Sequence, residues 1–167
     1  TAETVVSPST GAIANVNDVP TGGVVIAGSA TQNQTLTASN TLGDLDGLGV
    51  IGYQWQSSAD GTNWSNIIGA TSDSLSLTEA QVGQQMRVVA SYTDGHGTTE
   101  TVTSGTTGIV VNVNDASTGS VAISGSAVQN QALTASNTLG DLDGLGAIGH
   151  QWQASLDGAT WSNISGA

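Results

Sequence analysis

Short stretches in which apolar and polar residues alternate recur along the whole chain, separated by residues that favour turns. Turn signals arrive about every 8 to 12 residues, a spacing typical of sandwiches built from short strands. The pattern therefore predicts an all-β fold of β-sandwich type, without any long helix. We expect strands near residues 23–28, 34–39, 51–57, 62–67, 73–78, 85–93 and 98–113.

The alternation also predicts which side chains face the interior, because successive residues of a strand point to opposite faces. Ile51, Tyr53 and Trp55 share one face of their strand, and Trp55 is expected in the core. Asp60-Gly61 predicts a hairpin turn, and Thr78–Gly83 predicts one helical turn with Thr78 as its N-cap. The other residues expected to face inward are Leu75, Leu77, Met86, Val88, Ala90 and Tyr92.

The chain repeats itself with a shift of 97 residues. Residues 1–70 align with residues 98–167 without a gap, and 49 of these 70 positions are identical. The repeat predicts three parts: residues 1–14 as the last strand of a preceding repeat, 15–111 as a complete repeat, and 112–167 as the first strands of an incomplete one. We expect the incomplete repeat to be completed by another chain or by further sequence.

Several segments of the complete repeat form a recognisable set together with the linker Val16–Pro20 that precedes them. The segments are Tyr53–Gln56, Ser58–Gly61, Trp64, Leu77–Gly83 and Ser91–Gly95. This set resembles the immunoglobulin-like tandem repeats of giant bacterial surface adhesins, and the linker is similar to that of cadherin-like repeats. The resemblance covers the whole chain. It implies tandem immunoglobulin-like sandwiches in a long protein that is secreted by a type I system and used in cell adhesion and biofilm formation.

The composition excludes several classes of function. The 167 residues include 13 Asp or Glu and one Lys or Arg, which is Arg87, and the formal net charge is −12. Nucleic-acid binding and attraction to an anionic membrane both need clusters of cationic side chains, so both are excluded. The longest aliphatic runs, such as Val24–Ile26, are far too short to insert into a membrane. The absence of cysteine excludes disulfides, thiolate metal sites and cysteine nucleophiles.

Acidic residues occur in segments that an immunoglobulin-like topology brings to the end of the domain where the chain enters. The linker carries Asn17 and Asp18, the loop after the second strand carries Asp44 and Asp46, and the loop after the sixth carries Asp94. Oxygen-only ligands in flexible acidic loops suit calcium. We therefore predict a calcium-stiffened junction between repeats. The ligands predicted at the internal junction are Asn114, Asp115, Asp141 and Asp143, with Glu79 from the turn at the other end of the complete repeat.

A second interpretation of the same loops needs no ion. Asp-Gly pairs are ordinary turn formers, and a recent duplication would keep them identical in both copies. The sequence leaves both interpretations open.

No sequence pattern supports catalysis. A nucleophile elbow and a phosphate-binding loop are both missing, and Asp44 and Asp46 lie in one loop instead of facing each other across a cleft. We expect a non-enzymatic extracellular protein of the cell surface, in which each repeat contacts its neighbours and acts as a spacer. Two alternatives are self-assembly into a filament or sheath through open sandwich edges, and glycan binding at a ring such as Trp64.

Overall fold

The computed structural model describes residues 1–167 and is all-β, with eleven strands in antiparallel sheets. The single helix, η1 (Glu79–Gln81), is a 3₁₀ turn of three residues. No helix is long and apolar enough to cross a lipid bilayer. The chain divides into two compact units, unit 1 (Thr1–Asn112) and unit 2 (Val113–Ala167).

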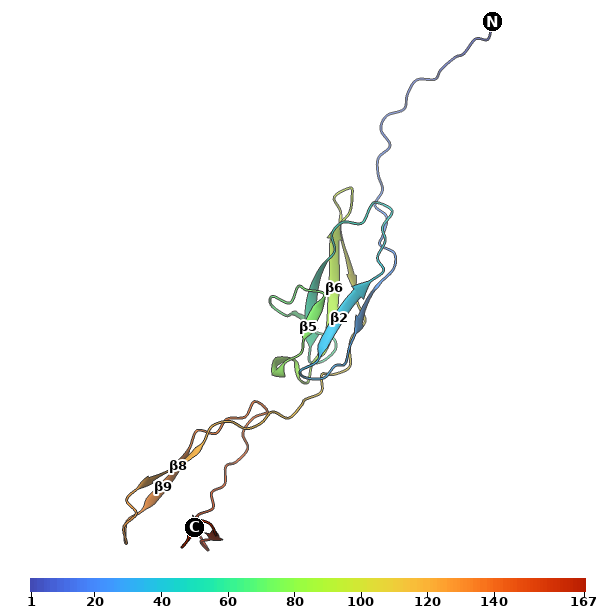
Figure 1. Cartoon of the computed structure of the whole chain (residues 1–167). Coiled ribbons are helices and arrows are strands. Elements are labelled where there is room, and N and C mark those ends of the chain that lie inside the picture. Colours follow the sequence, from blue (N-terminus) through green and yellow to red (C-terminus); the bar gives the residue numbers. More distant parts are fainter. The chain divides into compact units, whose positions relative to one another are not determined.

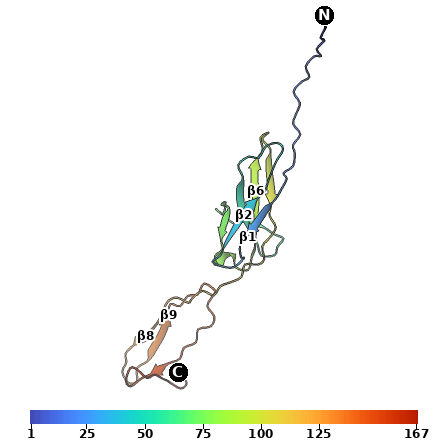
Figure 2. The same ribbon diagram turned by 45° about the vertical axis from the view of Figure 1, so that its right-hand side comes forward.

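Unit 1 contains two antiparallel sheets, and their strands can be followed in Figures 1 and 2. The longest pairing joins β3 to β6 over seven positions, from Gly52 opposite Ser91 to Ser58 opposite Gln85. The first sheet has the order β1 (Val24–Ala27), β2 (Thr35–Asn40), β5 (Ser74–Ser76). The second has the order β4 (Ser65–Asn66), β3 (Gly52–Ser58), β6 (Gln85–Thr93), β7 (Thr99–Thr103).

Both sheets contribute to one hydrophobic core in unit 1. Leu36 of β2, Trp55 of β3 and Val88 of β6 are fully shielded from solvent. The indole Nε1 of Trp55 donates a 3.0 Å hydrogen bond to the carbonyl of Ser72, so the one polar atom of the ring is satisfied. The inward-facing positions predicted from alternation are confirmed, because Leu75, Leu77, Met86, Val88, Ala90 and Tyr92 are all buried.

Several strands are shorter than the alternation predicts, and the predicted strand 73–78, for example, spans only Ser74–Ser76. The run 62–67 pairs only at Ser65–Asn66, because the preceding residues fold around the Asp60 carboxylate. The run 98–113 pairs with β6 as β7 only as far as Thr103. Beyond it the Thr107 N–H still reaches the Met86 carbonyl of β6 (2.9 Å), but the Val111 N–H reaches the Ala30 carbonyl (2.9 Å), next to the other sheet. The end of the segment therefore crosses from one sheet to the other.

Residues 1–20 contain no helix or strand, and their side chains are exposed except for the half-buried Pro20. Val5 and Ile13, for example, are 98% and 95% exposed. A strand needs a partner for its backbone groups, and residues 1–14 have none in this chain. Their assignment to a preceding repeat stays a prediction.

Unit 2 contains two hairpins, β8 (Val121–Gly125) with β9 (Leu133–Asn137), and β10 (Gln153–Ala154) with β11 (Ser162–Asn163). Their registers reproduce those of β1 with β2 and of β3 with β4, since Val121 faces Asn137 as Val24 faces Asn40. Residues 149–152 match the first part of β3 but form no strand. In unit 1 that part of β3 pairs with β6, and unit 2 holds no equivalent of β6. No residue of unit 2 is buried.

Candidate functional site at the linker pole

The loop that follows β2 and the loop that follows β6 are in contact in unit 1. The Gly95 N–H donates a 3.0 Å hydrogen bond to the Asp46 carbonyl. A Cβ atom on Gly95 would lie 2.5 Å from that carbonyl oxygen, and one on Gly49 would lie 2.1 Å from the carbonyl oxygen of Thr93. Only glycine permits these approaches, so the two glycines bring the loops together. We call this end of unit 1, with the linker that joins it, the linker pole.

The linker is held to the pole by hydrogen bonds. The backbone N–H of Asp18 donates to Oδ2 of Asp46 at 2.7 Å. Three residues later the linker forms a reciprocal backbone pair, in which the Thr21 N–H donates to Gly43 (2.8 Å) and the Gly43 N–H donates to Thr21 (3.1 Å). The Asn17 side-chain amide donates to Oε1 of Glu100 in β7 at 2.8 Å. The linker is therefore fixed at three residues, Asn17, Asp18 and Thr21.

Asp44 joins the loop to the core. Its Oδ1 accepts the backbone N–H of Asp46 (2.8 Å), and its Oδ2 accepts the hydroxyl of Tyr92 (2.5 Å), a buried residue near the end of β6. Burial, the hydrogen bond to Asp44 and the nearby carboxylates all disfavour the phenolate, so the pKa of Tyr92 lies well above its ordinary value. Tyr92 is therefore a permanent hydrogen-bond donor to the acidic loop.

Asp94 is the most unusual carboxylate of the pole because it is 6% exposed and only half satisfied. Its Oδ1 accepts the backbone N–H groups of His96 and Thr98, both at 2.8 Å. Burial alone would raise the pKa of Asp94, but the hydrogen bonds from Thr98 and His96 outweigh it and hold the pKa below its usual value. The ionised group therefore keeps a buried oxygen, Oδ2, that has no hydrogen-bond donor.

Three of these contacts recur in unit 2 at positions shifted by 97. The Asp115 N–H donates to Oδ2 of Asp143 at 2.7 Å, and Oδ1 of Asp141 accepts the Asp143 N–H at 3.0 Å. Thr118 and Gly140 form the matching reciprocal backbone pair. Unit 2 forms these contacts although it has no buried residue, so the clamp between linker and loop is a local structure that does not need the core.

The residues predicted as ligands are partly brought together. Asp18, Asp44, Asp46 and Asp94 all belong to the linker pole, whereas Asn17 uses its amide on Glu100. Glu79 lies in η1, before the start of β6, and Asp94 follows the end of β6, so the two belong to opposite ends of a strand of nine residues. The prediction that Glu79 joins Asn114, Asp115, Asp141 and Asp143 involves both units and stays a prediction.

The oxygen ligands of the pole are of the type that calcium prefers, but they do not lie close enough together to surround an ion. Carboxylate oxygens are the ligands that calcium prefers, and Oδ2 of Asp94 is a buried oxygen without a partner. However, no three His, Asp or Glu ligand atoms within unit 1 lie within 4.8 Å of one another. A bound ion would therefore have to draw the carboxylates closer together.

The alternative interpretation, turn chemistry, accounts for other acidic positions of the repeat. Oδ1 of Asp60 accepts the N–H groups of Thr62 (2.8 Å) and Asn63 (2.7 Å), and Asp157 makes the equivalent bonds in unit 2. These hydrogen bonds lower the pKa of Asp60 far below its usual value and that of Asp157 to about 2. Both residues are structural turn formers.

Several contacts of unit 1 were not predicted from the sequence, and two of them involve residues of β6. One is the bond between Tyr92 and Asp44. The other involves Arg87, whose guanidinium carbon lies 4.4 Å from the centroid of the Trp64 ring and whose Nε donates to Gln56 (2.7 Å). The one cationic side chain thus covers a face of Trp64, which favours packing over sugar binding for this ring. The alternation along β6 shows which face of the strand Tyr92 and Arg87 occupy. It does not show which residues of other strands they meet, because that depends on the register between the strands.

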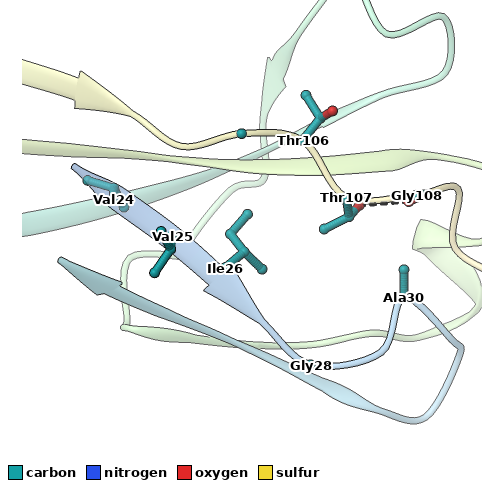
Figure 3. Close-up of a pocket in the computed structure, with 9 residues that line it drawn as sticks. Val24, Val25, Ile26, Gly28, Ala30, Thr106, Thr107 and Gly108 are labelled. Atoms are coloured by element: carbon teal, nitrogen blue, oxygen red, sulfur yellow. Dashed lines mark hydrogen bonds between the residues drawn. The ribbon is translucent and has the colours of Figure 1, made fainter.

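A shallow groove of about 360 Å³ lies between β1 and residues 105–108 (Figure 3). Val24, Val25 and Ile26 form one side, and Thr106 and Thr107 belong to the other. No residue that lines it carries a charge or an ionisable group. The groove therefore offers no acid, no base and no carboxylate or imidazole ligand.

Two antiparallel sheets around one core, with an acidic pole that holds the preceding segment, define an all-β domain. Residues 24–113 match a family described as a domain of unknown function (DUF8696). The match covers more than half of the chain, so the chain belongs to this family. It runs from the first residue of β1 to just beyond unit 1 and includes every strand of both sheets. No curated protein matches the chain.

Proposed function

We propose that this chain is a structural spacer, or stalk, of an extracellular bacterial surface adhesin. In this proposal the two sheets of unit 1 form an immunoglobulin-like sandwich, and sandwiches of 97 residues follow one another along the protein. The shared core of the two sheets and the 49 identical positions among 70 support this interpretation. In such an array each repeat contacts only its neighbours, so the junctions set the stiffness.

One observation carries the proposal, namely that each linker is clamped to its repeat in the same way. The hydrogen bonds from Asp18 to Asp46 and from Asp115 to Asp143 have the same length, 2.7 Å, and both bridge 28 residues. A linker held within hydrogen-bond distance of a folded loop loses rotational freedom. A clamp at every junction would shorten the free part of each linker, which supports a spacer.

Calcium is the proposed second component of the pole. The ionised Asp94 holds one buried oxygen without a donor, and Asp18, Asp44 and Asp46 add three more carboxylates. An ion there would compensate the unpartnered oxygen and the mutual repulsion. Extracellular calcium modules bind at about 10⁻⁴ to 10⁻³ M, so calcium is expected to act as a structural ion outside the cell.

Calorimetry with calcium tests this component. Millimolar calcium should release or absorb heat and raise the melting temperature of unit 1, and Asp94→Asn should remove most of both effects. Asp73→Asn is a matched control, because Asp73 is exposed and lies outside the pole. An unchanged melting temperature would contradict calcium binding at the pole, and the linker would then be held by hydrogen bonds alone.

The spacer function is tested by measuring how far an array of repeats extends from a cell surface. Arrays of one to four complete repeats are placed between a membrane anchor and a fluorescent domain on a bacterial surface. The height of the fluorescent domain should increase by a constant step for each repeat. A height that stops increasing after the first or second repeat would contradict a spacer.

A further inference from the structure

β1 is an end strand of its sheet, so one of its two edges has no strand beside it. The register shows which backbone groups this free edge carries. The Thr41 N–H donates to the Gly23 carbonyl (3.0 Å), and these two residues continue the pairing of Val24 with Asn40. Since bonded positions alternate along an antiparallel pair, Val24 and Ile26 point their N–H and C=O groups away from β2. The free edge therefore offers donors and acceptors to a further strand.

The groove beside β1 keeps this edge accessible (Figure 3). Its other wall, residues 105–108, is bonded to β6, because the Thr107 N–H donates to the Met86 carbonyl (2.9 Å) and the Thr107 hydroxyl accepts the Met86 N–H (2.9 Å). A Cβ atom on Gly105 or Gly108 would meet nothing within 4 Å. The wall therefore neither pairs with β1 nor fills the space beside it.

Of the end strands of unit 1, only β1 lacks a feature that hinders pairing with another chain. Natural sheets protect their edges with very short strands, charges or proline. β4 has only two residues, β5 is preceded by Asp73, and β7 carries Glu100. The sequence of β1 is Val-Val-Ile-Ala, which contains neither a charge nor a proline.

The absence of charge around β1 indicates which partner fits this edge. The net charge is −12, so two copies of the chain repel each other over most of their surface. No charged residue occurs in residues 21–43 or in residues 104–114, and these segments include both walls of the groove. A second copy therefore meets the least like-charge repulsion at β1, whereas a basic partner would favour the acidic loops.

We propose that two copies of the chain associate through β1, each adding its free edge to the sheet of the other around a two-fold axis. Val24 of each copy pairs with Ile26 of the other, which uses the donors and acceptors of both edges. Val25 then lies opposite Val25 of the second copy, on the outer face of the sheet, where its side chain is 59% exposed in the single chain. The two three-stranded sheets become one continuous sheet. This contact depends neither on the spacer role nor on calcium.

Single-cysteine cross-linking tests the pairing directly, because the chain has no cysteine of its own. Opposed residues that do not exchange hydrogen bonds lie closest together in an antiparallel pair, so Val25→Cys should give a disulfide-linked dimer in high yield under mild oxidation. Ile68→Cys is the matched control, because Ile68 is 99% exposed and lies outside β1. Equal dimer yields from the two variants would overturn the proposal.

Sedimentation equilibrium tests the same contact without a covalent bond. Val25→Asp places like charges opposite each other and should weaken the dimer by about 10-fold, while Ile68→Asp should leave it unchanged. Amide exchange of Val24 and Ile26 should slow as the concentration of the wild type rises. A wild type that stays monomeric at millimolar concentration, or a dimer that Val25→Asp does not weaken, would contradict pairing through β1.

Discussion

The backbone N–H of Asp18 and the Oδ2 atom of Asp46 are joined by a 2.7 Å hydrogen bond that spans 28 residues. Asp46 is almost fully buried, whereas Asp18 lies in an exposed linker. A buried, fixed acceptor thus holds a segment that has no secondary structure of its own. Since the bond recurs between Asp115 and Asp143, it belongs to the repeat and not to one copy of it.

Removing the acceptor should release the linker. Asp46→Ala leaves the Asp18 N–H without its partner, so we expect much faster hydrogen exchange at Asp18 and a loss of about 1 kcal/mol in the stability of unit 1. Asp73→Ala, an exposed substitution outside the pole, should change neither quantity. If Asp18 exchanges equally fast in the wild type and in Asp46→Ala, the clamp does not hold the linker.

Two turn aspartates should make the hairpins that follow β3 and β10 sensitive to strong acid. The folded pKa of Asp157 is about 2 and lies below the ordinary value of 3.8, so its ionised form stabilises the hairpin above pH 3.8. This contribution decreases as the pH falls from 3.8 towards 2. Asp60 has its pKa lowered in the same direction by the same kind of bonds. Carboxyl ¹³C chemical shifts should show both groups titrating below the ordinary range, and a midpoint near 3.8 for either would be incompatible with these turns.

The same substitution should destabilise the two copies of the repeat to different extents. Leu36→Ala empties a fully buried position and should lower the free energy of unfolding of unit 1 by about 2 to 5 kcal/mol. Leu133→Ala acts on a side chain that is 41% exposed and should cost less than about 1 kcal/mol. Urea denaturation of both variants checks this, and similar losses would mean that Leu133 is buried in solution.

Trypsin should report the opening of unit 1. Arg87 is the only Lys or Arg of the chain, and it lies within β6, where it pairs with Gln56 of β3. Cleavage needs an extended, unpaired backbone, so the native chain should resist trypsin and the unfolded chain should give two fragments. Leu36→Ala should accelerate cleavage in proportion to its loss of stability, and Leu133→Ala should not. Rapid cleavage of the native wild type would show that β6 is not stably paired with β3 around Arg87.

Much of this fold can be predicted from the sequence, because the alternation of apolar and polar residues shows directly which face of each strand is buried. β6 has the predicted bounds, and Trp55 occupies the predicted core position. The predicted strand 98–113 was too long, because alternation continues past the point where the segment leaves β6. Residues 149–152 show a different limit, since they match a strand in sequence yet form none without the partner that β6 provides.

The candidate site was predictable only in its outline. Loop topology brings Asp18, Asp44, Asp46 and Asp94 to one end, as expected from the order of the strands. Local spacing does not reveal that Asp46 holds a backbone N–H 28 residues away or that Asp44 accepts the Tyr92 hydroxyl. Both contacts depend on how the loops close over the end of β6, which Gly49 and Gly95 determine by close backbone approach.

The most direct test of the account is ¹⁵N relaxation of the linker amides in the intact chain. If the pole fixes the linker, Asp18 and Asp115 should have order parameters near 0.85, typical of rigid backbone, while residues 1–14 stay below about 0.6. Values for Asp18 as low as those for Val5 would contradict the central claim that each repeat clamps the segment through which the chain enters it.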